Sequence, residues 1–196
     1  MFIEIPNFIS QEEADVISNA LRTYADSNPV DRAVSRYGKS LFLSKLVHEG
    51  VQVAIDIDQR LYHHFSRIAK EVVIPNFQPD FPIGDSGYEY HWYKPGDICV
   101  RHSDGETAFE RDDNSHEIIG NQSRLRFATV LIYLKTCTDG GEIVFPKQNK
   151  IFKAEAGKLL VFPPYNYYEH YTNPSSQDRE IIMTWMNYDN IICNLV

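Results

Sequence analysis

The sequence has little cysteine, a deficit of positive charge and no long apolar run. Its three cysteines, Cys99, Cys137 and Cys193, are odd in number and widely separated. This pattern indicates buried free thiols in a reducing compartment and argues against a disulfide framework or a zinc site. The 19 Lys and Arg are outnumbered by 27 Asp and Glu, which gives a net charge of −8. Proteins that bind the nucleic-acid backbone usually carry a basic surface, so we expect no nucleic-acid partner.

Membrane and export signals are also lacking. No apolar stretch approaches the roughly 20 residues of a membrane-spanning helix. The opening MFIEIP lacks the basic and then apolar layout of a signal peptide. We therefore expect a cytoplasmic protein without a membrane partner. The length of 196 residues and an apolar content of 43% predict a single domain over residues 1–196. The oligomeric state cannot be read from the sequence.

The amino-terminal part predicts a strand followed by a helix. Residues 2–9 alternate between apolar and polar side chains, as in a short strand. Ser10 and Glu13 then have the spacing of a capping box, with Ser10 at the N-cap and Glu13 at the third helical position. Apolar residues follow at helical spacing and predict a helix over about residues 11–25.

A second amphipathic pattern predicts a helix over about residues 50–71. The polar residues 26–39 before it predict a loop or an edge hairpin. The helix should end before three prolines, since proline interrupts helical hydrogen bonding, and we expect an irregular segment bounded by Pro75, Pro79 and Pro82.

From about residue 86 the apolar pattern changes to a period of two. Polar residues 105–124 predict a long insertion between strands. Many short strands after two helices predict a β-sandwich or jelly roll with helices packed on one side. The predicted strands span about residues 88–93, 98–102, 125–134, 142–146, 151–154, 158–162 and 179–188.

Metal-binding residue types stand at the end of one predicted strand. His102 and Asp104 are two positions apart and would point to the same face of an extended strand. His170 follows a separate strand and turn, and would complete a set of two histidines and one carboxylate. This set is typical of non-haem Fe(II) oxygenases, with Mn, Co, Ni or Zn as substitutes. Arg179 opens the last strand, where its planar fork can hold a carboxylate through two hydrogen bonds.

Two other histidines compete as ligands. His91 lies on a predicted strand, but the residue two positions later is Tyr93 and offers no carboxylate. His116 lies in the polar insertion. Both are weaker candidates than His102 and His170.

Three blocks in order resemble the 2-oxoglutarate- and Fe(II)-dependent dioxygenases, specifically the prolyl 4-hydroxylase-like branch. The resemblance runs nearly the whole length. Its blocks are Tyr93-Lys94-Pro95-Gly96 with His102-Ser103-Asp104, then residues 126–134 (RFATVLIYL) with residues 140–146 (GGEIVFP), then residues 157–162 (GKLLVF) with His170, Pro174, Arg179 and Trp185.

The resemblance implies a mainly β fold with flanking helices, a double-stranded β-helix (jelly roll, cupin-like) packed against two N-terminal helices. It implies that His102, Asp104 and His170 bind Fe(II). It further implies that Arg179 holds the distal carboxylate of 2-oxoglutarate, that Tyr93 donates a hydrogen bond to it, and that Thr129 contributes to the same pocket. No side chain is assigned as a general acid, base or nucleophile, because the metal and its co-substrates do the chemistry.

Two departures from the family pattern stand out. Cys99 replaces an aromatic residue common three positions before the first metal histidine, which alters the substrate side of the pocket. Residues 175–178 (SSQD) before Arg179 replace the usual Val-x-x-Gly, so the assignment of Arg179 depends on its six-residue distance to Trp185.

The function implied is that of an Fe(II)/2-oxoglutarate-dependent dioxygenase that uses O2, with ascorbate as a candidate reductant, and hydroxylates a prolyl residue in a peptide or protein. Segments 26–39 and 105–124 would then hold the substrate. One alternative is hydroxylation of a free amino acid or another small molecule. A second, of a different class, is a non-catalytic metal-binding jelly roll that acts as an interaction module.

Overall fold

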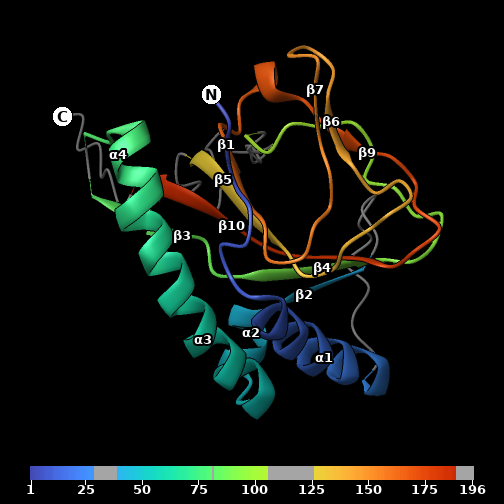
Figure 1. Cartoon of the computed structure of the whole chain (residues 1–196). Helices are drawn as coiled ribbons and strands as arrows, with labels where there is room; N and C mark the ends of the chain where they lie inside the picture. Colours follow the sequence, from blue (N-terminus) through green and yellow to red (C-terminus); the bar gives the residue numbers. More distant parts are fainter. Residues whose placement is uncertain (29–38, 81, 106–125, 189–196) are drawn as a thin grey trace, which may run out of the picture.

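The structure is a computed structural model, and it describes residues 1–28, 39–80, 82–105 and 126–188 (Figure 1). The helical segments are α1 (Gln11–Ser27), α2 (Leu43–His48), α3 (Gln52–Ile68), the π-helical turn η1 (Ala69–Val73), α4 (Ile74–Phe77) and the 3₁₀ turn η2 (Asn166–Tyr168). The strands are β1 (Ile3–Ile5), β2 (Lys39–Phe42), β3 (Ile83–Asp85), β4 (Glu89–Tyr93), β5 (Arg126–Tyr133), β6 (Ile143–Phe145), β7 (Lys150–Phe152), β8 (Leu159–Phe162), β9 (Tyr171–Thr172) and β10 (Arg179–Tyr188).

Two antiparallel sheets form the body of the molecule. The larger has seven strands in the order β1-β8-β5-β10-β4-β2, and β3 pairs with one end of β10. The smaller has three strands in the order β7-β6-β9. The helices cover the outer face of the large sheet, and the small sheet faces its inner side (Figure 1). This arrangement confirms the prediction of a mainly β jelly roll packed against helices.

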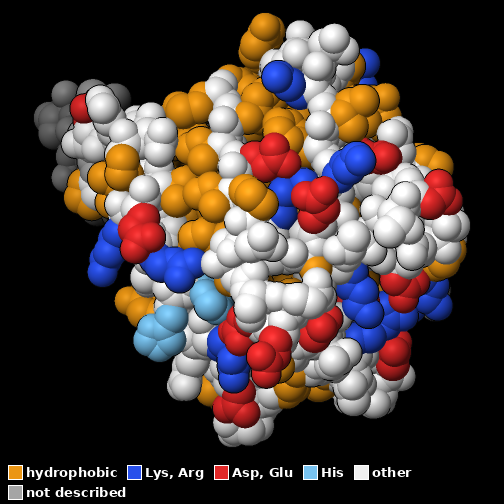
Figure 2. Space-filling view, in the orientation of Figure 1, with side chains coloured by type: hydrophobic (Ala, Val, Ile, Leu, Met, Phe, Trp, Pro, Cys, Tyr) orange, Lys and Arg blue, Asp and Glu red, His pale blue; other side chains and the backbone are white. Residues whose placement is uncertain are grey.

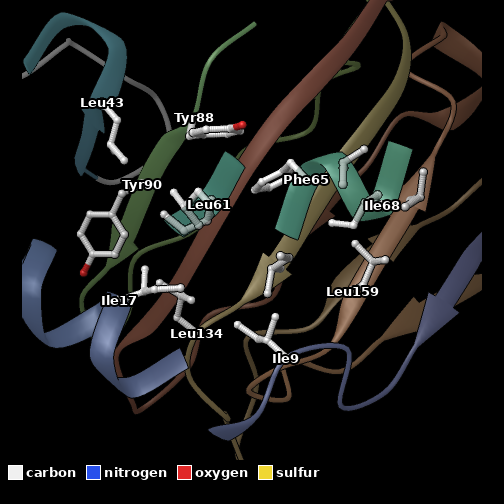
Figure 3. Packing of buried hydrophobic residues seen from close by; sticks show 14 of the residues in the cluster. Ile9, Ile17, Leu43, Leu61, Phe65, Ile68, Tyr88, Tyr90, Leu134 and Leu159 are labelled. Atoms are coloured by element: carbon white, nitrogen blue, oxygen red, sulfur yellow. The ribbon is translucent and has the colours of Figure 1, made fainter. Parts of the chain in front are cut away.

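Side chains alternate between the two faces along each strand, so the large sheet contributes to two separate hydrophobic cores. On β5, Val130 and Ile132 point to the helices and pack in a cluster with Ile17, Leu61 and Phe65 (Figure 3). Their neighbours Leu131 and Tyr133 point the other way, into a cluster between the two sheets with Phe145 and Phe162. Successive side chains of a strand point to opposite faces, so an uninterrupted apolar strand is buried on both sides.

The start of α1 confirms the predicted N-cap but not the whole capping box. The Ser10 hydroxyl accepts a hydrogen bond of 3.1 Å from the backbone N–H of Glu13. The Glu13 carboxylate does not return to Ser10. It binds Arg60 at 2.8 Å and His64 at 2.9 Å instead. The acidic side chain therefore joins α1 to α3, and Figure 2 shows charged side chains over these two helices.

The prediction of an irregular segment that begins at Pro75 is wrong. The chain stays helical to Phe77, through a π-helical turn over Ala69–Val73. Pro75 is the second residue of α4, which directly follows the π-helical turn, and it can donate no N–H to that turn. The side chain of Asn76 donates a 2.8 Å hydrogen bond to the carbonyl of Val72 and stabilises the junction between the π-helical turn and α4.

The strand predicted over residues 98–102 is not regular. His102 and His170 form an isolated antiparallel bridge, with backbone N–H to O distances of 3.0 and 2.9 Å. Nearer the start of the segment, the N–H of Cys99 donates 2.7 Å to the side-chain hydroxyl of Thr172. Because a side chain replaces the backbone acceptor there, the ladder is interrupted.

The remaining strand predictions are confirmed within a few residues, and short β2, β3 and β9 were not predicted. Of the predicted loops 26–39 and 105–124, residues 29–38 and 106–124 lie outside the described residues. No helix in the described ranges is long and apolar enough to cross a membrane. That residues 1–196 form one domain stays a prediction.

Candidate metal centre and co-substrate pocket

The structure brings His102, Asp104 and His170 together at the open end between the two sheets. Asp104 Oδ1 lies 3.2 Å from Nε2 of His102 and 3.9 Å from Nε2 of His170. Two donors that each bind a first-row metal ion at about 2.1 Å are separated by about 3–4 Å. The three side chains form a group able to hold one ion.

The metal-facing nitrogens are set by hydrogen bonds on the far side of each ring. Nδ1 of His102 lies 2.8 Å from the carbonyl of Val100, and Nδ1 of His170 lies 3.1 Å from the carbonyl of Tyr168. A carbonyl only accepts, so Nδ1 carries a proton and Nε2 is the nitrogen that faces the metal position. The prediction that His102 and Asp104 share one face of an extended strand is wrong, because Asp104 lies in the turn that follows His102.

The carboxylate of Asp104 is itself held in place. The Thr129 hydroxyl donates a 2.7 Å hydrogen bond to Oδ2, the oxygen that does not face the histidines. Arg126 donates 2.7 Å to the backbone carbonyl of Asp104, and its guanidinium lies 3.7 Å from the ring centre of Trp185. Buried carboxylates with such donors orient a metal rigidly.

The three side chains influence one another electrostatically. Burial alone would lower the pKa of His102, but its hydrogen bonds to Asp104 and Cys99 raise that pKa to about 11. Burial would raise the pKa of Asp104, yet the two histidines hold it well below its usual range. Burial lowers the pKa of His170. The metal-free centre therefore holds one proton that a metal ion would displace.

A cavity of about 370 Å³ extends from this triad along the inner face of the large sheet. At its far end lies Arg179, which is 3% exposed. Its Nε donates 3.1 Å to the carbonyl of Gly141, but its Nη1 is buried without a hydrogen-bonding partner. Its guanidinium lies 4.9 Å from the ring centre of Tyr93 and 5.5 Å from that of Tyr133. A buried guanidinium with an unpaired Nη1 donor fits a carboxylate ligand.

The Gly140–Gly141 turn positions Arg179, and only glycine fits there. Both residues have positive φ angles of 73° and 75°. A Cβ added to Gly140 would lie 1.9 Å from the carbonyl oxygen of Pro174. The turn therefore presents the Gly141 carbonyl to Arg179 in a conformation that larger residues rarely adopt.

Tyr133 is a residue that the sequence analysis did not assign to the site. Its hydroxyl is buried without a hydrogen-bonding partner beside Arg179. A signal was present in the sequence, because Tyr133 is four positions after Thr129 and both would point to the same face of the predicted strand.

The other candidates are placed as follows. Tyr93, Thr129 and Trp185 line the cavity, although the hydroxyl of Thr129 is directed to Asp104 and not to the Arg179 end. Cys99 also lines it, with Sγ 3.7 Å from Nδ1 of His102. His91 does not join the metal group and pairs with Glu89 at 2.9 Å. His116 lies outside the described residues.

Comparison with known proteins identifies the family. The sequence profile of the 2OG-Fe(II) oxygenase superfamily matches residues 88–187, which span the triad, Arg179 and most strands of both sheets. The chain belongs to this superfamily. It is therefore an enzyme of the Fe(II)- and 2-oxoglutarate-dependent dioxygenase class that uses O2. No curated protein matches the sequence significantly.

Solved structures of low sequence identity share the fold. A viral collagen prolyl hydroxylase from Paramecium bursaria Chlorella virus-1, in its 2-oxoglutarate complex, is 22% identical with a TM-score of 0.69, covering 96% of both chains. A prolyl 4-hydroxylase from Pseudomonas putida is 16% identical with a TM-score of 0.61, covering 96% of this chain and 93% of that one. A prolyl hydroxylase from Trichoplax adhaerens, in complex with a hypoxia inducible factor peptide, is 20% identical with a TM-score of 0.61, covering 95% and 83%.

Proposed function

We propose that this dioxygenase hydroxylates a prolyl residue in a peptide or protein. The main observation is that the cavity joins a His–Asp–His group to a buried guanidinium whose Nη1 has no hydrogen-bonding partner. The solved relatives named as prolyl hydroxylases support the choice of a prolyl substrate, and one of them is a complex with a peptide.

His102, Asp104 and His170 would hold the Fe(II). Two neutral imidazoles and one carboxylate leave coordination positions open on an octahedral ion, as a co-substrate and O2 require. The fixed Nε2 lone pairs and the Thr129-bonded carboxylate suit this ion without rearrangement. When bound, the metal with 2-oxoglutarate and O2 supplies the oxidising power that inserts oxygen into a substrate C–H bond and yields succinate and CO2.

Arg179, Tyr93 and Tyr133 would hold 2-oxoglutarate by its distal carboxylate. The guanidinium provides the positive charge and the free Nη1 donor, while the buried Tyr133 hydroxyl offers a second donor. Burial also raises the pKa of both tyrosines, so their hydroxyls keep their protons and remain donors. Three converging groups would orient the co-substrate along the cavity toward the metal end.

The testing experiment is an anaerobic titration of Fe(II) and 2-oxoglutarate, followed by the weak visible charge-transfer band of the chelate. We expect a band in the wild-type protein and its loss in His102→Ala and Arg179→Ala. His63→Ala and Arg60→Ala, which change the same residue types on α3, are matched controls and should keep it. Proline-containing peptides and free amino acids are then compared by succinate release.

The results separate the alternatives. Succinate release with peptides but not with free amino acids supports the proposal, whereas the reverse would indicate a small-molecule hydroxylase. Absence of the band with iron bound would contradict a catalytic role and leave a metal-binding module.

A further inference from the structure

A carboxylate and an imidazole line the cavity without a role in the metal group or at the Arg179 end. Glu89 and His91 lie on β4 and point into the same cavity as the triad. Their side chains are 13% and 10% exposed, and Oε2 of Glu89 lies 2.9 Å from Nε2 of His91. An ionised carboxylate only accepts, so His91 donates this bond and fixes the orientation of Glu89.

The pair has unused acceptor capacity. Nδ1 of His91 is buried without a hydrogen-bonding partner. Within the described residues Glu89 makes no salt bridge to an arginine or lysine. A mostly buried carboxylate is stabilised by hydrogen-bond donors, and within the described residues Glu89 has His91 as its side-chain donor. The lining therefore contains a negative group whose natural partner is a cation with N–H donors.

The other charged residues of the lining are already engaged. Asp104 belongs to the metal group, and Arg126 binds its carbonyl and stacks on Trp185. Arg126 is also near enough to Glu89 to attract it electrostatically, but the two side chains form no salt bridge. Arg179 is bound to Gly141 and faces the predicted position of 2-oxoglutarate. Glu89 is therefore the charged residue of the lining without a role in the metal group or at the Arg179 end.

The strand register sets the spacing between Glu89 and Thr129, the residue that supports the metal ligand Asp104. Thr129, which binds Asp104, pairs with Trp185 on β10, and Met183 on the same strand pairs with Glu89. Two strand spacings and two residues along β10 correspond to roughly 12 Å between the Cα atoms of Thr129 and Glu89. This exceeds the size of one prolyl ring. It matches one or two residues of extended chain, at about 3.5 Å each, plus a long side chain.

We propose that Glu89, oriented by His91, binds the positively charged side chain of a lysine or arginine that flanks the target prolyl residue of the substrate peptide. This proposal depends on the proposed function only in taking the target residue of the peptide to be proline. The recognition of a basic side chain follows from the Glu89–His91 pair and can be tested without turnover.

The first test is calorimetric binding to the protein loaded with Mn(II) and 2-oxoglutarate without O2. The probes are seven-residue peptides with blocked ends and a central proline, flanked by lysine, arginine, glutamine or glutamate. We expect the lysine and arginine peptides to bind at least about tenfold more tightly than the glutamine peptide, since desolvated charge pairs couple strongly.

Three variants identify the group responsible. Glu89→Gln should remove the preference, and Glu89→Lys should reverse it toward the glutamate peptide. Glu71→Gln, a change of the same type on an exposed side chain of η1, should retain it. Unchanged affinity for 2-oxoglutarate in each variant shows that the pocket is intact.

The outcomes distinguish this proposal from the one that precedes it. Equal binding of all peptides, binding of none, or an undiminished preference in Glu89→Gln would overturn the role of Glu89. A charge preference without succinate release would support Glu89 and contradict prolyl hydroxylation. Succinate release without a charge preference would support prolyl hydroxylation and contradict the role of Glu89.

Discussion

The hydroxyl of Thr129 donates a 2.7 Å hydrogen bond to Oδ2 of Asp104, while Oδ1 of the same carboxylate faces the two histidines. Each oxygen therefore has a separate partner. Thr129→Val keeps the side-chain shape but removes this donor and leaves Oδ2 buried without it. Loss of such a partner typically weakens metal binding about 10–100-fold. We expect a rise of this size in the Fe(II) dissociation constant, measured anaerobically by competition with a chromophoric chelator.

Thr129→Ser is the matched control, because it restores the hydroxyl and loses only a methyl group. It should bind Fe(II) within a few-fold of the wild-type protein. If the valine and serine variants bind Fe(II) equally well, Thr129 is a core residue and not a support of the metal ligand.

Changes at Arg179 and Tyr133 should affect 2-oxoglutarate and not the metal. Arg179→Lys keeps the charge but loses the planar fork and the bond to Gly141. Hydrogen bonds to charged groups are worth about 1.5–3 kcal/mol, so we expect the KM for 2-oxoglutarate to rise about 10–100-fold. Tyr133→Phe removes one donor and should raise it about tenfold. Succinate release over a range of 2-oxoglutarate concentrations measures both effects.

The Fe(II) affinity of these variants provides the control. It should stay unchanged, because neither side chain touches the triad. A Tyr133→Phe protein with the wild-type KM would show that Tyr133 is not part of the anchor and that Arg179 acts with Tyr93 alone.

Local chemistry explains the parts of the fold that the sequence predicted. β5 and β10 are long, mostly apolar and buried on both faces, and the Ser10 cap forms within three residues. Such features depend on neighbours in sequence. The irregular segment at Cys99 depends instead on the side chain of Thr172, 73 residues away, and no periodicity could have predicted it.

The site shows the same division. The three ligands of the metal group could be predicted from the sequence. The way they converge could not, because they do not share one face of a strand as expected. Their convergence depends on the bridge between His102 and His170 and on a turn at Asp104. The Glu89–His91 pair was missed because its role depends on the cavity that it lines, which is made by six other strands and the segment around residues 99–104.

Metal affinity should rise with pH. Hydrogen bonds to Asp104 raise the pKa of His102 to about 11 in the metal-free protein, above the 6.5 of an unfolded histidine. The protonated ring therefore contributes stability that is fully present below pH 6.5 and is lost as the pH rises through 11. A metal ion must displace this proton, so between pH 7 and 9 affinity should increase about tenfold per pH unit. Titrations with Mn(II) at three pH values measure the slope.

Proton release gives an independent measure of the same linkage. Calorimetry in two buffers of different ionisation enthalpy should show about one proton released for each Mn(II) bound at pH 8. A pH-independent affinity with no proton release would contradict the picture of a protonated His102 in the metal-free centre.

Glu180 should matter for stability and not for the reaction. It follows Arg179 on β10, so its side chain points to the helices, where it is 1% exposed. Its Oε2 accepts hydrogen bonds from Ser18 at 2.5 Å and Tyr90 at 2.8 Å. Glu180→Ala would leave both buried hydroxyls without this acceptor and should lower the free energy of unfolding by about 3 kcal/mol. Urea denaturation measures the loss.

Tyr90→Phe removes only one of these hydrogen bonds and should cost about 1 kcal/mol. Below their unfolding transitions both variants should keep the wild-type KM for 2-oxoglutarate, because alternation along β10 separates Glu180 from the cavity that Arg179 lines. If Glu180→Ala instead raised this KM as strongly as Arg179→Lys, the buried carboxylate would be positioning Arg179 through the strand. The two faces of β10 would then not be independent.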